Sequence, residues 1–553
     1  MDHAGPQTLG ALLRARSDLG DVDALVLPGQ RVSYADLNAA ARRWAKAFIA
    51  LGIVQGDHVG LLFNTCTSFV EALFGAAMAG AAVVPVNARY QPAELAYLIE
   101  NADLTVLVTD GAPDGPVDFL GRLRLALPSL SAAGVGVGLQ FPEAPRLRTL
   151  VATGRGGEGG VAAAQDVLAA GDRVPDDDLD ARIEEVLPDQ IAIILYTSGT
   201  TANPKGCLIT HRAMTGNARA LAKRYDIHAG DRFWSPLPMF HIAGILPLTG
   251  AIDRCAAYLT IPSFEAGVAL DMLSGERATH AYPCFVTIMQ DLINHPRFGD
   301  TDLSRVRLMN SNLAVQPAWI AEAIAKAMPR AVQVGTYGLT EGVGTICTSR
   351  PVDPYELRVG RLGVPLDDWE VKIVDPETGL PREAGEQGEI LARGPNAMRG
   401  YYRDPDKTAA TFNAEGWMRT GDIGSIDASG HIMFHGRLKD MLKVGGENVA
   451  AAEIEAVLDS HPAVQLSQVV GMPDPRYAEV PAAFVELKSG ASATEAELIA
   501  FCRGRIARFK IPHAVRFVNS WPMSTTKIQK FQLRDRMLAE LDAEGSTRAP
   551  AGG

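Results

Sequence analysis

Residues 58–110 alternate between short apolar runs and segments with helical spacing, and this alternation restricts the fold more than any other feature of the sequence. The runs HVGLLFN, AAVVPVN and LTVLVTD are separated by SFVEALFGAAMAG and PAELAYLIENA. Strands that alternate with helices in this way are typical of a parallel sheet covered by helices on its faces. The pattern predicts an α/β protein, and a second stretch of the same kind follows at residues 191–341.

The remaining regions have a different texture. Residues 113–189 are rich in Gly, Pro and Asp, and we expect them to interrupt the alternation, with GRGGEGG at residues 154–160 as a mobile surface excursion. Beyond Val359, short strands punctuated by Gly and Asp predict a β-rich subdomain. A last unit mixes helices and strands, and a tail at residues 546–553 is expected to be disordered.

Composition narrows the class of protein. With 553 residues the chain is too long for one ordinary core, and 47% hydrophobic and 21% charged residues are typical of a globular protein. A net charge of -12 argues against a nucleic-acid partner but leaves an anionic ligand open. The six cysteines show no metal or redox spacing, and neither a signal peptide nor an integral membrane segment is evident. We therefore expect a soluble, cytoplasmic protein.

The segment YTSGTTANPKG, residues 196–206, follows the apolar run IAIIL. Consecutive hydroxyl groups, small residues and one lysine can surround a polyphosphate with donors. The segment is not a P-loop, because the GxxxxGK[ST] spacing is absent. On composition alone, a polar hairpin loop explains it equally well.

Together with six further segments in the same order, this loop resembles the phosphate loop of the adenylate-forming superfamily, which contains acyl-CoA synthetases, luciferases and peptide-synthetase adenylation domains. Each segment alone is modestly specific, and their joint occurrence through nearly the whole chain carries the resemblance. It implies a large N-terminal domain of helix-covered sheets with a β-rich subdomain, residues 1–437, and a small mobile α+β C-terminal domain, residues 438–545, with its hinge at Lys439. The other six segments are PMFHIAG (238–244), YGLTE (337–341), GEI to GYY (388–402), TGD (420–422), GRLKD to GGEN (436–448) and PMSTTKI (522–528).

The resemblance implies an ATP-dependent, AMP-forming acid–thiol ligase with ATP, Mg²⁺ and coenzyme A as cofactors. Attack of a carboxylate on the α-phosphate brings two anions together, so catalysis is mostly positioning and charge neutralisation. The implied catalytic residues are Lys527, Lys443, His241 and Thr340, and the implied magnesium ligands are Glu341 and Thr201. The implied nucleotide and coenzyme A contacts are Thr197, Ser198, Gly199, Thr200, Thr201, Lys205, Ser311, Asn312, Ala314, Thr336, Tyr337, Gly338, Glu341, Asp422, Arg437, Gly445 and Gly446. The implied acyl pocket comprises His241, Gly244, Phe285, Gly342, Val343 and Gly344.

In this superfamily the C-terminal domain rotates between an adenylating and a thioester-forming pose. One rotation would exchange Lys527 for the loop from Lys443 to Gly446. Gly445 and Gly446 have no side chains, so a pantetheine arm can pass close to the backbone. The thiol would then attack the acyl adenylate, which requires no nucleophile from the protein.

Each assignment has an ordinary alternative. A lone aspartate in TGD is usually a turn residue, and a lone lysine such as Lys527 is usually a solvated charge. His241 between apolar neighbours is more often a core histidine, and Glu341 could be an ordinary acid at a helix N-terminus. Only the joint occurrence of the segments favours the functional interpretation.

Three segments depart from the glycine pattern of the superfamily, and all lie on the ATP side. They are Ala202-Asn203 in the phosphate loop, Ser311-Asn312-Leu313-Ala314 in the adenine loop, and Thr526 before Lys527. We favour the interpretation that these three changes are variations between lineages that the enzyme tolerates. The alternative hypothesis is an enzyme that adenylates slowly or not at all and accepts a preformed acyl adenylate.

Other functions are compatible with parts of the pattern. One alternative function is a stand-alone adenylation enzyme that loads a carrier protein. A luciferase is a second alternative, and we favour it less because it is a specialised use of the same chemistry. A non-catalytic nucleotide-binding protein would be expected to have lost Lys527 or Glu341, and both are present.

Because the pocket residues are mostly small and apolar, we predict a roomy hydrophobic pocket and a bulky or medium-to-long acyl group. The expected partners are a small carboxylic acid or its acyl adenylate, and coenzyme A.

Overall fold

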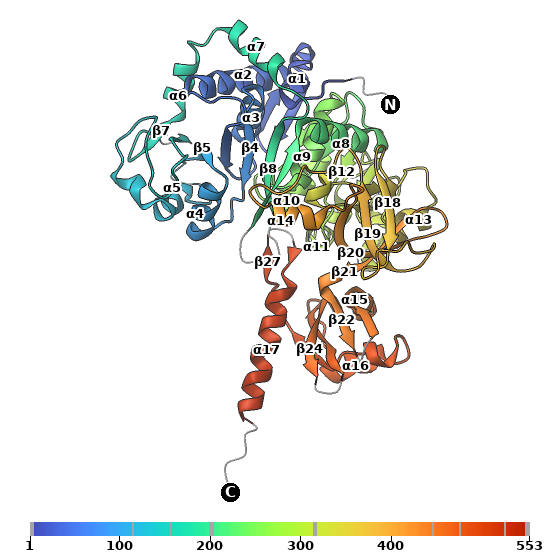
Figure 1. Ribbon diagram of the computed structural model, residues 1–553. Coiled ribbons are helices and arrows are strands. Elements are labelled where there is room, and N and C mark those ends of the chain that lie inside the picture. Colours follow the sequence, from blue (N-terminus) through green and yellow to red (C-terminus); the bar gives the residue numbers. More distant parts are fainter. Residues whose placement is uncertain are drawn as a thin grey trace.

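The structure is a computed structural model that describes residues 5–112, 115–154, 156–197, 204–312, 318–444, 447–474, 477–524 and 527–547. In Figure 1 a large α/β body carries a smaller unit below it, and α17 (Lys530–Thr547) runs along that unit. The α/β class and the division into a large and a small part are confirmed. Within the described residues, no helix combines the length and the apolar character needed to cross a membrane.

The predicted alternation forms the first of two seven-stranded sheets, in the order β7-β6-β5-β3-β4-β8-β9. Its strands run parallel except for β9, which pairs antiparallel with β8. Helices cover both faces, which explains why the strands read as continuous apolar runs. The strands are β3 (His58–Leu62), β4 (Ala82–Val86), β5 (Leu104–Asp110), β6 (Thr149–Thr153), β7 (Val161–Ala163), β8 (Ile191–Thr197) and β9 (Lys205–Thr210), and the helices nearby are α1 (Leu9–Arg14), α2 (Tyr34–Ala50), α3 (Thr67–Met78) and α4 (Pro92–Asn101).

The expectation that residues 113–189 interrupt the alternation is wrong in part. β6 pairs in parallel with β5, and β7 pairs in parallel with β6, so this stretch extends the sheet. Both strands are short and lie among glycines, which hides their period in the sequence. The stretch also contains α5 (Phe119–Ala126), α6 (Ala164–Gly171) and α7 (Asp176–Glu185).

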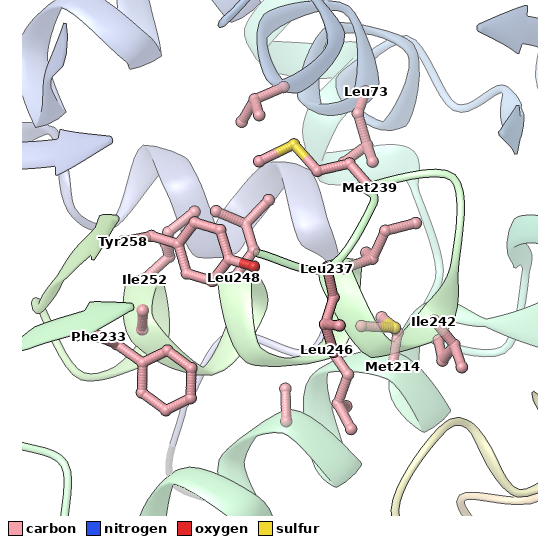
Figure 2. Close-up of a cluster of buried hydrophobic side chains, with 14 of the residues drawn as sticks. Leu73, Met214, Phe233, Leu237, Met239, Ile242, Leu246, Leu248, Ile252 and Tyr258 are labelled. Carbon is pink, nitrogen blue, oxygen red and sulfur yellow. The ribbon is translucent and has the colours of Figure 1, made fainter. Parts of the chain in front are cut away.

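The second seven-stranded sheet has the order β14-β13-β12-β10-β11-β1-β2 and takes two strands from near the N-terminus. Helix α9 contributes Leu246, Leu248 and Ile252 to the large buried cluster that also contains Leu73 and Tyr258, and Figure 2 shows Leu248 and Ile252 beside Tyr258. The elements are β1 (Asp23–Leu27), β2 (Gln30–Ser33), β10 (Arg232–Trp234), β11 (Ala257–Leu259), β12 (His280–Ala281), β13 (Leu308–Asn310), β14 (Val332–Val334), α8 (His211–Arg224), α9 (Ile242–Asp253), α10 (Ala266–Gly275), α11 (Val286–Asn294) and α12 (Ala318–Ala327).

A β-rich part follows, as predicted from the punctuated strands. It consists of a three-stranded and a four-stranded antiparallel sheet. Its elements are β15 (Thr336–Tyr337), β16 (Cys347–Thr348), β17 (Val364–Pro365), β18 (Glu370–Val374), β19 (Gly388–Arg393), β20 (Met418–Ile426), β21 (Ile432–Arg437), α13 (Tyr355–Gly360) and α14 (Pro405–Thr411).

The C-terminal unit has its own hydrophobic clusters on the two faces of a five-stranded sheet. Ser546 and Thr547, the first residues of the expected disordered tail, belong to α17, because the glycine before them weakens a helix without ending it. The remaining elements are β22 (Met441–Val444), β23 (Glu447–Ala450), β24 (Val464–Asp474), β25 (Ala478–Leu487), β26 (Ala514–Phe517), β27 (Met523–Ser524), β28 (Lys527–Ile528), α15 (Ala451–Asp459) and α16 (Glu495–Cys502).

Candidate active site

The predicted phosphate loop is the tip of the β8–β9 hairpin. Thr197 pairs with Lys205 in the last described rung before the tip. The Tyr97 hydroxyl of α4 donates to the Pro204 carbonyl at 3.2 Å, which fixes one end of the loop against the neighbouring helix. The predicted contacts Ser198, Gly199, Thr200 and Thr201, and the departure at Ala202, lie outside the described residues.

Three predicted nucleotide-binding side chains form one cluster around the buried carboxylate of Asp422. The register of β20 and β21 places Asp422 directly opposite Arg437. The Arg437 Nε lies 2.8 Å from Asp422 Oδ1, and the Tyr337 hydroxyl donates to Asp422 Oδ2 at 2.8 Å. Asp422 is only 2% exposed, so the charge of Arg437 and the hydrogen bond from Tyr337 offset the loss of water around its carboxylate. Burial, followed by the Asp422 charge, raises the pKa of Tyr337 well above its usual range, which keeps its hydroxyl a donor.

The predicted magnesium ligand lies at a cavity beside this cluster. Glu341 belongs to the short 3-10 turn η5 (Thr340–Gly342), and its Oε1 accepts a hydrogen bond from the Tyr401 hydroxyl at 2.8 Å. Burial, followed by the Glu341 charge, raises the pKa of Tyr401. The cavity has a volume of about 250 Å³, and its lining includes Glu341, Glu389, Tyr401, Lys407, Arg419 and Gly421. Its wall therefore combines a metal-type ligand with two cationic side chains.

Two glycines shape this region. A Cβ at Gly338 would lie 1.7 Å from the Gly344 carbonyl oxygen, so the segment 338–344 can fold back on itself only because a hydrogen stands there. Gly421 has a φ of +68°, a left-handed conformation that glycine adopts without strain. The backbone amide of Gly421 also donates to the buried Glu389 at 3.3 Å.

Asn312, one of the departures from the glycine pattern, is accommodated by its backbone. Its φ is +48°, and asparagine tolerates this left-handed region better than most residues do. Its Oδ1 accepts from the Thr336 amide at 2.5 Å, and its Nδ2 donates to the Cys284 carbonyl at 3.4 Å. The side chain thus ties the adenine loop to two neighbouring segments. Ser311 is buried beside it, whereas Leu313 and Ala314 lie outside the described residues.

The predicted acyl segment is clamped from α8. The buried Asn217 Nδ2 donates to the carbonyls of Val343 and Thr345 at 2.8 and 2.9 Å, and Asn217 Oδ1 accepts from Trp369 Nε1 at 2.9 Å. Val343 has a φ of +51°, which is strained for a β-branched residue and persists because the surroundings hold it. The segment is therefore rigidly placed.

The glycines of the predicted acyl pocket do not by themselves leave room for an acyl group. A Cβ at Gly344 would lie 2.8 Å from Leu246 Cδ2, and one at Gly342 would lie 2.5 Å from Ile346 Cδ1. At Gly244, a Cβ would meet the Pro238 carbonyl oxygen at 2.5 Å. The room for an acyl group at these positions therefore depends on how the neighbouring side chains move.

The other two predicted pocket residues lie at helix N-termini. His241 occupies the N-cap position of α9, and its ring centroid is 4.9 Å from that of Phe240. Phe285 occupies the N-cap position of α11. Both are partly buried, and their role in binding an acyl group stays a prediction.

The predicted hinge and the two lysines lie on the C-terminal side. Lys439 is exposed in the short turn η6 (Leu438–Asp440) between β21 and β22, the last strand of the β-rich part and the first of the C-terminal unit. Lys443 lies in the β22–β23 hairpin and Lys527 in the β27–β28 hairpin. Gly445 and Gly446, like Thr526, lie outside the described residues. The hinge, the domain bounds and the lysine roles stay predictions.

Sequence reasoning missed three side chains that organise the site. Tyr401 and Glu389 belong to the segment at residues 388–402, which resembles the superfamily as a whole and in which neither residue was assigned a role. Asn217 lies in a helix with no motif, and only its contacts with the 343–345 carbonyls reveal it. The feature that marks Asn217 is its complete burial, which is unusual for an asparagine and cannot be read from the sequence.

Comparison with known proteins identifies the family. The AMP-binding enzyme family matches residues 14–402, and the AMP-binding enzyme C-terminal domain matches residues 453–527. A mitochondrial medium-chain acyl-CoA ligase of Rattus norvegicus is 32% identical over 97% of this chain and 88% of its own. A Mycobacterium tuberculosis CoA ligase, named for a propanoyl group bearing a methyl-dioxo-octahydroindenyl ring system, is 35% identical over 96% of this chain and 98% of its own.

The fold is also shared with a solved structure. The anthranilate CoA ligase AuaEII, solved in complex with anthranoyl-AMP, has a TM-score of 0.83 and 27% identity, covering 97% of this chain and 98% of that chain. These comparisons confirm the resemblance to adenylate-forming enzymes and its acyl-CoA synthetase branch.

Proposed function

The chain belongs to the AMP-binding enzyme family, and from this premise we propose that it joins a hydrophobic carboxylic acid to coenzyme A. The acid would displace pyrophosphate from ATP to give an acyl adenylate. The thiol of coenzyme A would then displace AMP to give the thioester. Acyl-CoA ligases of this family use ATP, Mg²⁺ and coenzyme A.

The observation that carries the proposal is the placement of the two lysine hairpins. Both Lys443 and Lys527 belong to the small C-terminal unit, and the exposed Lys439 lies where that unit joins the large one. One small body with two separate lysine hairpins supports two successive half-reactions at one nucleotide site. A rotation at the junction would present one hairpin and withdraw the other.

The residues around the cavity fit the nucleotide and its metal. Asp422 and Arg437 are proposed to contact the ribose. Glu341 is proposed to hold Mg²⁺, which prefers oxygen ligands, because its carboxylate lines the cavity and has lone pairs left beyond the Tyr401 bond. Bound there, the metal would neutralise phosphate charge.

The acid is proposed to be bulky or medium-to-long and apolar. The apolar helix α9 supports this, because Ile242 and Leu246 lie against Gly344 of the acyl segment. The names of the two relatives also indicate a medium-chain acid and a ring-bearing propanoate. Truncation of Leu246 to alanine should favour bulkier acids, and an unchanged order of preference would contradict the pocket assignment.

Separate measurement of the half-reactions tests the proposal. The protein is incubated with ATP, Mg²⁺ and a panel of fatty, aryl and polycyclic acids, first without and then with coenzyme A. We expect acyl-AMP in the first case and acyl-CoA in the second, both detected by mass spectrometry, with Lys527→Ala removing most acyl-AMP formation. Acyl-CoA formation only from supplied acyl-AMP would instead support the thioester-forming alternative.

We also propose a cytoplasmic location. All six cysteines lie within the described residues and none of them forms a disulfide there, as expected of a protein kept in a reducing compartment. Recovery of the native protein in the membrane-free cytosolic fraction would support this location, and recovery with an exported fraction would contradict it.

A further inference from the structure

The hairpin that carries Lys527 is small, and its position depends on what holds its base. Among the described residues, β27 and β28 pair through Met523 with Ile528 and through Ser524 with Lys527. The Gln529 amide donates to the Pro522 carbonyl at 2.8 Å and closes the base. A two-stranded ribbon of this length has little stability of its own, so its anchors decide where the two strands lie.

One anchor lies on the β28 side. Lys530 is the first residue of α17, and its Nζ lies 2.5 Å from Glu455 Oε1 of α15. The pair is largely buried, with the Lys530 and Glu455 side chains 21% and 13% exposed. Glu455 Oε1 also accepts from the Val469 amide of β24 at 2.6 Å. The carboxylate is thus fixed to the sheet, and it fixes the lysine three residues after Lys527.

A second anchor lies on the β27 side. The Trp521 Nε1 donates to Glu486 Oε2 of β25 at 2.6 Å. Beyond the base, Leu533 and Met537 bury the first turns of α17 against the same sheet. The hairpin is therefore held at both ends by acidic side chains that belong to the body of the C-terminal unit.

We propose that Glu455, through Lys530, and Glu486, through Trp521, are positioning residues for Lys527 in the adenylation half-reaction. This inference rests on the proposed function, because it takes Lys527 as the residue that acts on the α-phosphate. Catalysis by placement of a charge is sensitive to displacement, and a shift of about 1 Å can cost about a hundredfold in rate. Thioester formation uses the other pose, in which this hairpin has left the nucleotide, so it does not depend on these anchors.

The main variant is Glu455→Gln, which keeps the side-chain size and an acceptor for the Val469 amide but removes the charge that holds Lys530. The matched control is Glu453→Gln on the same helix. Glu453 pairs with Lys510 at 2.6 Å, but its side chain is 46% exposed and the pair is remote in sequence from the hairpin. Trp521→Phe tests the second anchor by removing only the indole donor.

Two rates are measured for each protein: pyrophosphate release from ATP and acid without coenzyme A, and thioester formation from supplied acyl-AMP and coenzyme A. We expect Glu455→Gln and Trp521→Phe to slow the first about ten- to a hundredfold and to change the second by less than about twofold. Glu453→Gln should leave both rates unchanged. Lys530→Met should match Glu455→Gln, and the double variant should be no slower than either single one, because both remove the same ion pair.

Equal losses in both half-reactions, or the same loss in Glu453→Gln, would overturn the proposal and assign the anchors a purely structural role. Failure of the proposed function looks different. In that case the wild-type protein releases no pyrophosphate with any acid of the panel, or Lys527→Ala releases it as fast as the wild type.

Discussion

Replacement of Asp459 with asparagine should stabilise the C-terminal unit at neutral pH and flatten its pH dependence. Asp459 lies at the end of α15, and its Oδ1 accepts from the Ser467 hydroxyl at 2.7 Å. Burial raises its pKa to about 8, the Glu455 charge adds to this, and Ser467 and Lys530 act in the opposite direction. Folding therefore brings this carboxyl group into a site that favours its protonated form.

The sign follows from which state holds the proton. Between a pH of about 4, where the unfolded carboxyl group ionises, and about 8, the folded state binds a proton that the unfolded state has released. The contribution of Asp459 to the free energy of unfolding is fully present below a pH of about 4 and is lost as the pH rises to about 8. One proton corresponds to at most about 1.4 kcal/mol per pH unit, hence roughly 2–3 kcal/mol between pH 5 and 7. Asparagine cannot ionise and keeps an oxygen that accepts from Ser467.

Hydrogen exchange of peptides from β24 reports the opening free energy of this unit without interference from the large domain. The difference between Asp459→Asn and the wild type should be small at pH 5 and grow to favour the variant by a few kcal/mol at pH 7. Parallel profiles across this range, or a variant less stable at both values, would refute the assignment of the raised pKa to Asp459.

Three further predictions concern the nucleotide side of the site. Tyr401→Phe removes the hydroxyl that holds Glu341 and should slow acyl-AMP formation about tenfold, as expected for a hydrogen bond to a charged group; an unchanged rate of pyrophosphate release would exclude this role. Tyr337→Phe leaves Asp422 with fewer donors and should raise the KM for ATP about tenfold with little change in the KM for coenzyme A, which steady-state kinetics would measure. Asn312→Gly should lower the melting temperature by a few degrees and leave adenylation within about threefold, whereas a large gain in adenylation would favour the hypothesis that this departure impairs it.

The fold was predictable from the sequence where the strands are long and apolar. β3, β4 and β5 are recognisable because both faces of the sheet are covered, so each strand is a continuous apolar run. β7 was not, because three buried residues among glycines carry no measurable period. Strand order was also beyond reach, since β1 joins the second sheet beside β11, which lies more than two hundred residues away.

The site was predictable as a set of residues but not as an arrangement. Asp422 and Arg437 were each assigned to the sugar from their motifs. Their direct ion pair depends on the register of β20 with β21, which includes a bulge after Ile423. One residue more or less in that bulge would turn one of the two side chains to the other face. Motifs thus identify chemistry, and register decides which groups meet.

The acyl pocket shows the limit of composition most clearly. Small residues at 342–344 predicted a roomy pocket, yet Leu246 and Ile346 already occupy the space next to these glycines. Leu246 lies in α9, almost a hundred residues earlier, so the volume at Gly344 is set by a distant helix and not by the motif itself. Because Asn217 also clamps the segment from α8, the acyl segment cannot move aside on its own. Acid selectivity should therefore vary with residues on α9, while the segment that contains Glu341 keeps its glycines for backbone geometry.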